Sequence, residues 1–226
     1  MKMNDELSQI DVVGGVKIYS VKGAPTSFLF KAGAAIDADG SPTCYGPNNI
    51  GDDYTANGGD DSGGSWWGGP IKDGKPIVQK IYEPAPGYYV CGTAHVVPGF
   101  SDSIQYRYID SKSIPFLVLP GNHANGARLG DVGLCYNTVT GDNCYGIYAD
   151  VGPSGKIGEM SQRMADALKL ESSPKTGGTI TLTIAYLVFP GSMNGWQPPD
   201  VWFNHANNLF GQWGHLSRLK ELIRYI

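Results

Sequence analysis

The sequence predicts a mainly β protein, a single β-rich domain with one or two helices whose strands close into a barrel. Glycine and proline are abundant, with 32 Gly and 15 Pro among 226 residues, beside 13 Tyr and 5 Trp. This composition is typical of short strands joined by tight turns. Apolar runs are short, no internal repeat is visible, and one segment has a clear helical period. Many short strands with few helices favour a barrel.

The first part of the chain predicts two short strands and a long polar loop. Residues 1–14 are expected to be a loose lead-in, and Val16–Val21 and Ser27–Phe30 are predicted strands. Ala34–Gly64 is rich in Asp, Asn and Gly and is predicted to be a loop. A loop of this length is uncommon unless it is functional, so we expect part of a site there.

The rest of the chain has stronger signals. Thr179–Phe189 is the clearest strand because it is rich in β-branched residues. Glu159–Leu170 is the best helix because its apolar residues recur at helical spacing, and Leu216–Ile226 is expected to be a short second helix. Further strands are predicted at Pro76–Tyr82, Tyr88–Val97 and Ile114–Leu119, with a hairpin formed by Asp131–Tyr136 and Tyr145–Asp150.

Charge and hydropathy exclude two classes of partner. The net charge is −4 and there is no run of Lys or Arg, so we expect no binding to nucleic acid. No run of 18 apolar residues occurs, so we expect no membrane insertion. Residues 1–20 lack the apolar segment of a signal peptide. A protein acting outside the cell would then be a domain of a longer exported protein, or an export substrate without such a signal.

Two acidic residues nine positions apart are the strongest candidates for catalysis. Asp150 ends a predicted strand and Glu159 begins the predicted helix, after a turn rich in Gly and Pro. Two carboxylates held on rigid elements across a cleft can cut a glycosidic bond. The alternative is that each is a helix cap or a surface acid. A helix N-terminus at Glu159 would stabilise its anion, which opposes a role as general acid.

The polar loop and the tryptophans are candidates for substrate binding. Asp37, Asp39, Asp52 and Asp53 lack the spacing of a calcium-binding loop, so they either form turns or bind substrate. Trp66 and Trp67 lie among glycines and favour an exposed stacking platform, whereas the position of Trp213 near the last helix favours packing. Core packing is the alternative for all of them.

Cysteine and histidine spacings indicate no metal site. Cys44, Cys91, Cys135 and Cys144 show no C-x-x-C pattern, and no paired histidine motif occurs. Cys135 and Cys144 flank a turn and could form a disulfide or remain free thiols. A hydrolase that uses Cys44 or Cys91 with a histidine is a further possibility.

The chain resembles the family-75 glycoside hydrolases, the family of fungal chitosanases, over roughly residues 30 to 215. Five segments in the same order carry this resemblance: AIDADGSPTCYGPNNIGDDYTANGG at Ala35–Gly59, IPFLVLPG at Ile114–Gly121, LGDVGLCYN at Leu129–Asn137, YGIYADVGPSGKIGEMSQRMADAL at Tyr145–Leu168 and LVFPGS at Leu187–Ser192.

The resemblance implies a fold and an activity. The fold would be a compact six-stranded barrel of the double-psi type with long loops. Residues 1–30 would form a lead-in and the first strands, and residues 31–226 the catalytic domain. The activity would be inverting endo-hydrolysis of a β-1,4-linked amino-sugar polymer without metal or organic cofactor, with Glu159 as acid and Asp150 as base. We expect substrate contacts from Asp37, Asp39, Tyr45, Asp53, Asn57, Trp66, Trp67 and Asp131.

Several alternatives remain open at this stage. The chain lacks the signal peptide usual in the family, and Met160 follows Glu159 where a small residue is more usual. The substrate could be chitosan, or the glycan of peptidoglycan if the protein is a lysozyme-like domain of a longer toxin or phage protein. Both substrates place the expected activity outside the cytoplasm, in the periplasm or outside the cell. A non-catalytic glycan-binding barrel is the remaining alternative.

Overall fold

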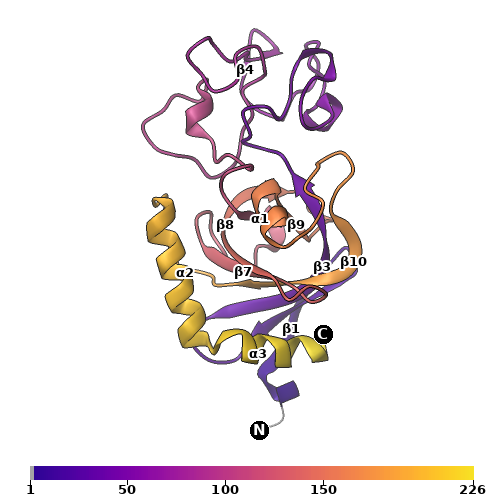
Figure 1. Ribbon diagram of the computed structural model, residues 1–226, viewed down its shortest axis with the longest axis vertical. Helices are drawn as coiled ribbons and strands as arrows, with labels where there is room; N and C mark the ends of the chain where they lie inside the picture. The colour runs from indigo at the N-terminus through magenta and orange to yellow at the C-terminus, as the bar shows by residue number, and fades with distance from the viewer. Residues whose placement is uncertain (1–2) are drawn as a thin grey trace.

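Six strands close into a mixed β-barrel in the computed structural model, which describes residues 3–226 (Figure 1). Their order around the barrel is β3-β10-β7-β8-β6-β9, and β9 pairs back to β3. The β3–β9 and β6–β8 pairs are parallel and the others are antiparallel. This confirms the predicted mainly β fold on a six-stranded barrel. The bounds are β3 Ser27–Asp37, β6 Phe116–Pro120, β7 Val132–Asn137, β8 Asn143–Gly152, β9 Glu159–Ser161 and β10 Thr179–Val188.

An apolar cluster packs along the strands of the barrel. Leu117, Met160 and Ile184 have no exposed surface there. The rings of Phe30 and Tyr186 stack with centroids 4.7 Å apart, and the Tyr186 hydroxyl donates a hydrogen bond to the carbonyl of Gly33. Burial of so many large side chains stabilises the barrel because each contributes roughly 1.5–3 kcal/mol on leaving water.

Two helices cover part of the barrel wall through a second apolar cluster (Figure 1). Helix α2 (Pro199–Trp213) runs along its side and α3 (His215–Leu222) crosses its base. Trp213 is 2% exposed and its Nε1 donates to Oγ of Ser27, which confirms the expected packing role. The structure also confirms a helix near the C-terminus, whereas α2 was not predicted. No helix in the described part of the chain is long and apolar enough to cross a membrane.

The N-terminal segment is more ordered than we expected. Strand β1 (Leu7–Val13) forms a hairpin with β2 (Val16–Val21), which pairs with β3. The two-residue turn between them has both glycines at positive φ, 54° for Gly14 and 84° for Gly15, as a tight hairpin turn requires. The prediction of a loose lead-in is therefore wrong for the described residues before Gly14. Strand β1 was missed because most of its side chains are polar or exposed.

Residues 38–115 form a loop-rich lobe above the barrel, between β3 and β6 (Figure 1). Its regular structure is limited to the short hairpin of β4 (Ile71–Lys72) and β5 (Lys75–Pro76) and three turns of 3₁₀ helix. The strands predicted over residues 76–82 and 88–97 are wrong, since only isolated bridges such as Val78 with Tyr89 form. The 3₁₀ helices of the chain are Met3–Glu6, Pro47–Asn49, Thr55–Gly58, Gln105–Arg107, Gly121–His123 and Ile223–Tyr225.

Most other predicted elements are confirmed, but the predicted helix of residues 159–170 is shorter. Its first three residues form β9, and α1 covers only Gln162–Ala167. The Ser161 side chain caps α1 by accepting a hydrogen bond from the Met164 amide. In the hairpin of β7 and β8, Cys135 lies opposite Cys144 as expected, and both are free thiols.

Candidate active site

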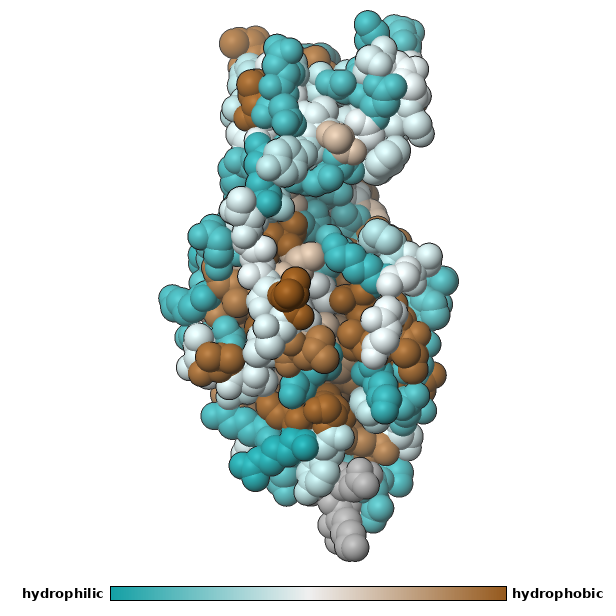
Figure 2. Space-filling view, turned by 90° about the vertical axis from the view of Figure 1, so that its right-hand side faces the viewer, coloured by the Kyte–Doolittle hydropathy of each residue, from teal (hydrophilic) through white to brown (hydrophobic). Residues whose placement is uncertain are grey.

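A cleft of about 640 Å³ lies where the lobe meets the barrel. In the space-filling view the molecule narrows at this level, and hydrophilic surface predominates there (Figure 2). Eight of the ten residues predicted for the site line this one cleft. They are Asp37, Asp39, Tyr45, Asp53, Asn57, Trp67, Asp150 and Glu159.

Strand register fixes the two predicted catalytic carboxylates relative to each other. Val118 on the central strand β6 pairs with Asp150 of β8 on one side and with Glu159 of β9 on the other. The two acidic residues are therefore two strand spacings apart, roughly 9.5 Å between backbones in a flat sheet. A register shift in the β6–β8 pair contributes to this arrangement, because Leu117 pairs with Tyr148 and Ala149 is the extra residue.

Two backbone amides bind the Asp150 side chain, and its burial favours the protonated, neutral form of the carboxyl group. Its Oδ1 accepts hydrogen bonds from the amides of Ala94, at 2.8 Å, and Val151, at 2.9 Å. Burial raises its pKa to about 6, and the nearby negative charge of Glu159 acts in the same direction against the lowering effect of those amides. A carboxyl group with such a pKa can carry a proton at mildly acidic pH.

Glu159 is on a strand rather than at a helix N-terminus. Residue Gln162 begins α1, so the macrodipole tension expected from the sequence is removed. The Nζ of Lys156 lies 3.5 Å from Oε1 of Glu159. Gly152 of β8 approaches the same side chain, since a Cβ added at Gly152 would lie 3.3 Å from Oε2 of Glu159. This glycine leaves the carboxylate room beside its cationic neighbour.

Two further acids from the end of β3 complete a carboxylate group around Asp150. Asp37 accepts a hydrogen bond from the Asp39 amide at 2.7 Å. Oxygen atoms of Asp37, Asp39 and Asp150 all lie within 4.8 Å of one another, which is also a spacing that a cation could bridge. Burial raises the pKa values of Asp37 and Asp39 well above the usual range, and the negative charge of neighbouring groups, Asp150 among them, acts in the same direction. These side chains can share protons with Asp150.

The lobe supplies the polar and aromatic residues of the cleft. Asn57 Nδ2 donates to both carboxylate oxygens of Asp53, at 2.9 and 3.0 Å. Trp67 is 66% exposed, and its Nε1 donates to the Asn57 carbonyl, which orients the indole. An exposed, oriented aromatic ring can stack against a sugar ring, as the sequence predicted for this tryptophan.

Two predicted residues do not line the cleft. The ring of Trp66 packs edge-on against Tyr45 and Tyr89, so it belongs to the small core of the lobe. Asp131 has no exposed surface and accepts hydrogen bonds from the amides of Gly191 and Met193, among others. We correct both assignments, because Asp131 anchors the loop after β10 and Trp66 offers no open ring face to a ligand in the cleft.

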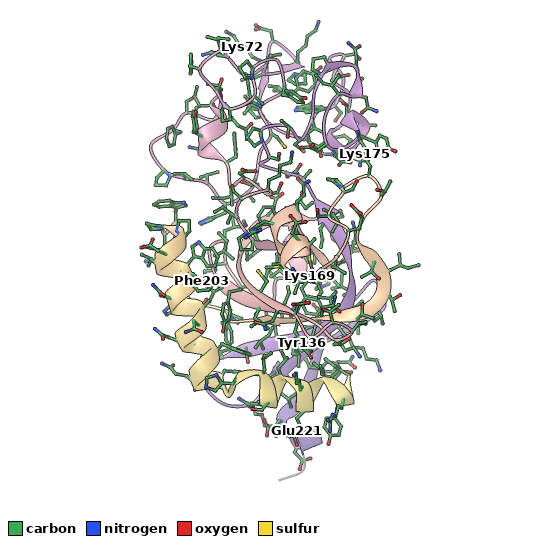
Figure 3. The ribbon with its side chains drawn as sticks, in the orientation of Figure 1. Lys72, Tyr136, Lys169, Lys175, Phe203 and Glu221 are labelled. Carbon is green, nitrogen blue, oxygen red and sulfur yellow. The ribbon has the colours of Figure 1, made fainter. Side chains whose placement is uncertain are left out.

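The structure adds residues that sequence reasoning missed. Lys156 lies in a segment that we had singled out, but its contact with Glu159 depends on the turn before β9. Pro174 and Gly177, from the loop before β10, also line the cleft. In that loop Lys175 reaches the lobe, where its Nζ donates to the Gly51 carbonyl at 2.7 Å (Figure 3). No local sequence signal identifies these contacts.

Comparison of the sequence with protein-family models and with curated proteins finds no match. The functional assignment therefore depends on the residues of the cleft and their geometry.

Proposed function

We propose that the protein is an endo-acting glycoside hydrolase that cuts β-1,4 bonds of an amino-sugar polymer by acid–base catalysis. The observation that carries this proposal is the position of Asp150 and Glu159 on either side of Val118 in one cleft. Inverting hydrolases hold their two carboxyl groups about 6.5–9.5 Å apart, which leaves room for the attacking water. Two residues separated by one intervening strand can hold their carboxyl groups within that range, whereas residues on adjacent strands would hold them closer together.

The surroundings of the two carboxylates support roles opposite to those that we assigned from the sequence. The pKa of Asp150 is raised to about 6, which suits the group that protonates the leaving oxygen. The ammonium group of Lys156 lies 3.5 Å from Oε1 of Glu159, and Glu159 is left as the group that activates water. We therefore assign Asp150 as general acid and Glu159 as general base.

The charge of the cleft supports a cationic substrate. Among the described residues that line it there are five carboxyl side chains and one ammonium group, that of Lys156. The chain as a whole has a net charge of only −4, so the acidity is concentrated at the cleft. Burial favours the protonated forms of Asp37 and Asp39, so the attraction for a polymer with free amino groups comes from those of the five carboxyl groups that are ionised. The substrate class that fits this charge is chitosan. Because chitosan is a cell-wall polysaccharide, the proposed activity is outside the cytoplasm.

The burial of the cysteines disfavours the cysteine-hydrolase alternative. Cys44 and Cys91 have no exposed surface, and burial raises the pKa of the Cys44 thiol. A nucleophilic cysteine needs an accessible thiolate.

The test is digestion of chitosan and of purified peptidoglycan in separate reactions, with products identified by mass spectrometry. We expect oligomers from chitosan, and a loss of about 10²–10⁴-fold in rate for Asp150→Asn and for Glu159→Gln. The rate should fall as the pH rises above about 6, because Asp150 then loses the proton that it must donate.

A matched control is Asp53→Asn, which removes a cleft carboxylate that we assign to binding and should reduce affinity more than turnover. Release of peptidoglycan fragments without chitosan cleavage would show that the protein is a muramidase and not a chitosanase. Binding of both polymers without new reducing ends, or near-full activity of both variants, would disprove the catalytic proposal.

A further inference from the structure

Three side chains from separate parts of the lobe meet beside the cleft. The thiols of Cys44 and Cys91 lie 3.6 Å and 3.5 Å from the same oxygen of Asp39, Oδ1. The two sulfur atoms and the carboxylate oxygen are all within 4.8 Å of one another. Cys44 and Cys91 are far apart in the sequence, so the spacing of cysteines gave no sign of this group.

These separations agree with the edges of a tetrahedral metal site. Zinc binds thiolate sulfur at about 2.3 Å and carboxylate oxygen at about 2.0–2.2 Å, so a tetrahedral arrangement places sulfur and oxygen about 3.5 Å apart. The observed sulfur–oxygen distances of 3.5 and 3.6 Å match this edge. The three atoms would need little movement to hold an ion between them.

The electrostatic environment favours a cation at this position. Asp37 and Asp150 are the acidic neighbours of Asp39. Within the part of the chain that the structure describes, none of the ion pairs involves any of these three carboxylates. In this structure the two thiols donate hydrogen bonds to Asp39, and backbone amides donate to Asp37 and Asp150. A divalent cation would take the place of the thiol protons and bind the resulting thiolates together with the Asp39 carboxylate.

The location of the group gives such an ion a structural purpose. Cys44 and Cys91 have no exposed surface and belong to a small cluster with Ala38, Tyr45 and Tyr89. A loop-rich lobe with so few apolar side chains is the kind of structure that metals or disulfides commonly hold together. Asp39 also lines the cleft, so the ion would connect the lobe core with the candidate active site.

We propose that Asp39, Cys44 and Cys91 bind one zinc ion that holds the lobe together. Two thiolates and a carboxylate are a ligand set that zinc accepts, and the thiolates disfavour magnesium and calcium. Among the described residues no fourth His, Cys, Asp or Glu joins this group, so a water molecule would complete the coordination. The test of this inference is independent of the proposed hydrolase activity, because its readout is metal binding alone.

The test is titration of the reduced full-length protein with Co²⁺ followed by Zn²⁺. Thiolate coordination of cobalt gives a charge-transfer absorbance, and we expect it to saturate at one ion per chain and to be displaced by zinc. Binding should tighten as the pH rises, because ligation releases the thiol protons. Cys44→Ser and Cys91→Ser each leave one thiolate, so each should lower the charge-transfer absorbance by at least half, and Asp39→Asn should weaken binding at least tenfold.

Cys144→Ser is the matched control, because it removes a thiol from the other cysteine pair and should leave the titration unchanged. Circular dichroism of each variant separates loss of a ligand from loss of folding, and the titration of the unaltered protein needs no variant. Absence of a charge-transfer band in the unaltered protein would overturn the proposal. So would a band of undiminished intensity in both cysteine variants, or a Cys44–Cys91 disulfide in protein isolated under oxidising conditions.

Discussion

The barrel and the loop lobe are held together by different interactions. In the barrel, side chains such as Leu117 and Met160 are completely buried in an apolar cluster. Hydrogen bonds between neighbouring strands pair their backbone amides and carbonyls. In the lobe, the side-chain amides of buried glutamines form hydrogen bonds with backbone groups. Gln79 donates to the carbonyls of Pro42 and Tyr89, and Gln105 donates to those of Gly40 and Cys91. One half is built mainly on hydrophobic burial and the other mainly on hydrogen bonds.

This difference matches the division of roles in the cleft. The barrel strands supply Asp150 and Glu159, whose separation would have to stay fixed under the proposed function. The lobe supplies Asn57 and Trp67, which would contact substrate and can tolerate adjustment. We therefore expect substitutions in the two halves to have effects of different size and extent.

The largest expected effect is loss of a barrel core side chain. Leu117→Ala should lower the free energy of unfolding by about 2–5 kcal/mol, because it leaves a cavity in a closely packed interior. Urea denaturation followed by circular dichroism measures this change. Leu182→Ala, at a position 54% exposed on β10, is the control and should stay within about 0.5 kcal/mol of the unaltered protein. Equal effects of the two would contradict the packing described for the barrel.

Loss of a buried amide should affect the lobe alone. Gln105→Ala removes the partner of the Cys91 amide and of two carbonyls, and each unsatisfied group costs roughly 1–3 kcal/mol. Hydrogen exchange should accelerate at lobe amides such as that of Cys91 and stay slow in β10. Gln9→Ala, an exposed glutamine, is the control. Faster exchange throughout the barrel would show that the two halves unfold together.

Neutralising Asp150 should stabilise the protein at neutral pH. Its folded pKa of about 6 is above the ordinary value of 3.8, so its effect on stability is most favourable below pH 4 and is lost as the pH rises through 6. Asp150→Asn should therefore raise the free energy of unfolding by about 1–3 kcal/mol at pH 7.5 and much less at pH 4. Denaturation at both pH values measures this. The exposed Asp73→Asn is the control, and a pH-independent difference for Asp150→Asn would refute the assigned cause.

The smallest expected effect concerns the exposed aromatic ring of the lobe. Trp67→Ala should raise KM for chitosan roughly tenfold, about 1.4 kcal/mol, with little change in kcat. Trp67→Phe should retain most of the affinity, since it keeps a ring that can stack. Tyr82→Ala is the control, because Tyr82 is 60% exposed on the lobe and does not line the cleft. Steady-state kinetics would contradict a stacking role if Trp67→Phe and Trp67→Ala raised KM by the same factor.

The sequence predicted the barrel better than the lobe for a physical reason. Thr179–Phe189 and the β7–β8 hairpin have apolar, β-branched patterns that report burial directly. The lobe depends on hydrogen bonds between distant residues, such as Gln105 with Gly40, and a linear pattern does not encode them. The same limit explains β9, where strand pairing with β3 and β6 overrides the helical spacing that begins at Glu159.

The candidate site shows a similar division. Asp150 and Glu159 became candidates because their segment is distinctive, and the acids of the polar loop became candidates because so long a loop is uncommon without a function; the structure brings both sets into one cleft. Asp131 misled us, because a buried aspartate that accepts loop amides resembles a site residue in sequence. The meeting of Asp39, Cys44 and Cys91 depends entirely on the fold of the lobe.

The place of Val118 between Asp150 and Glu159 has a consequence for stereochemistry. The backbones of neighbouring strands are about 4.8 Å apart, so two acids paired directly across such strands would hold their carboxyl groups near the spacing of enzymes that retain the configuration of the anomeric carbon. One intervening strand roughly doubles that distance and admits a water molecule. Under the proposed function, strand order in the barrel would determine the anomer released, and NMR of the first product formed should show inversion.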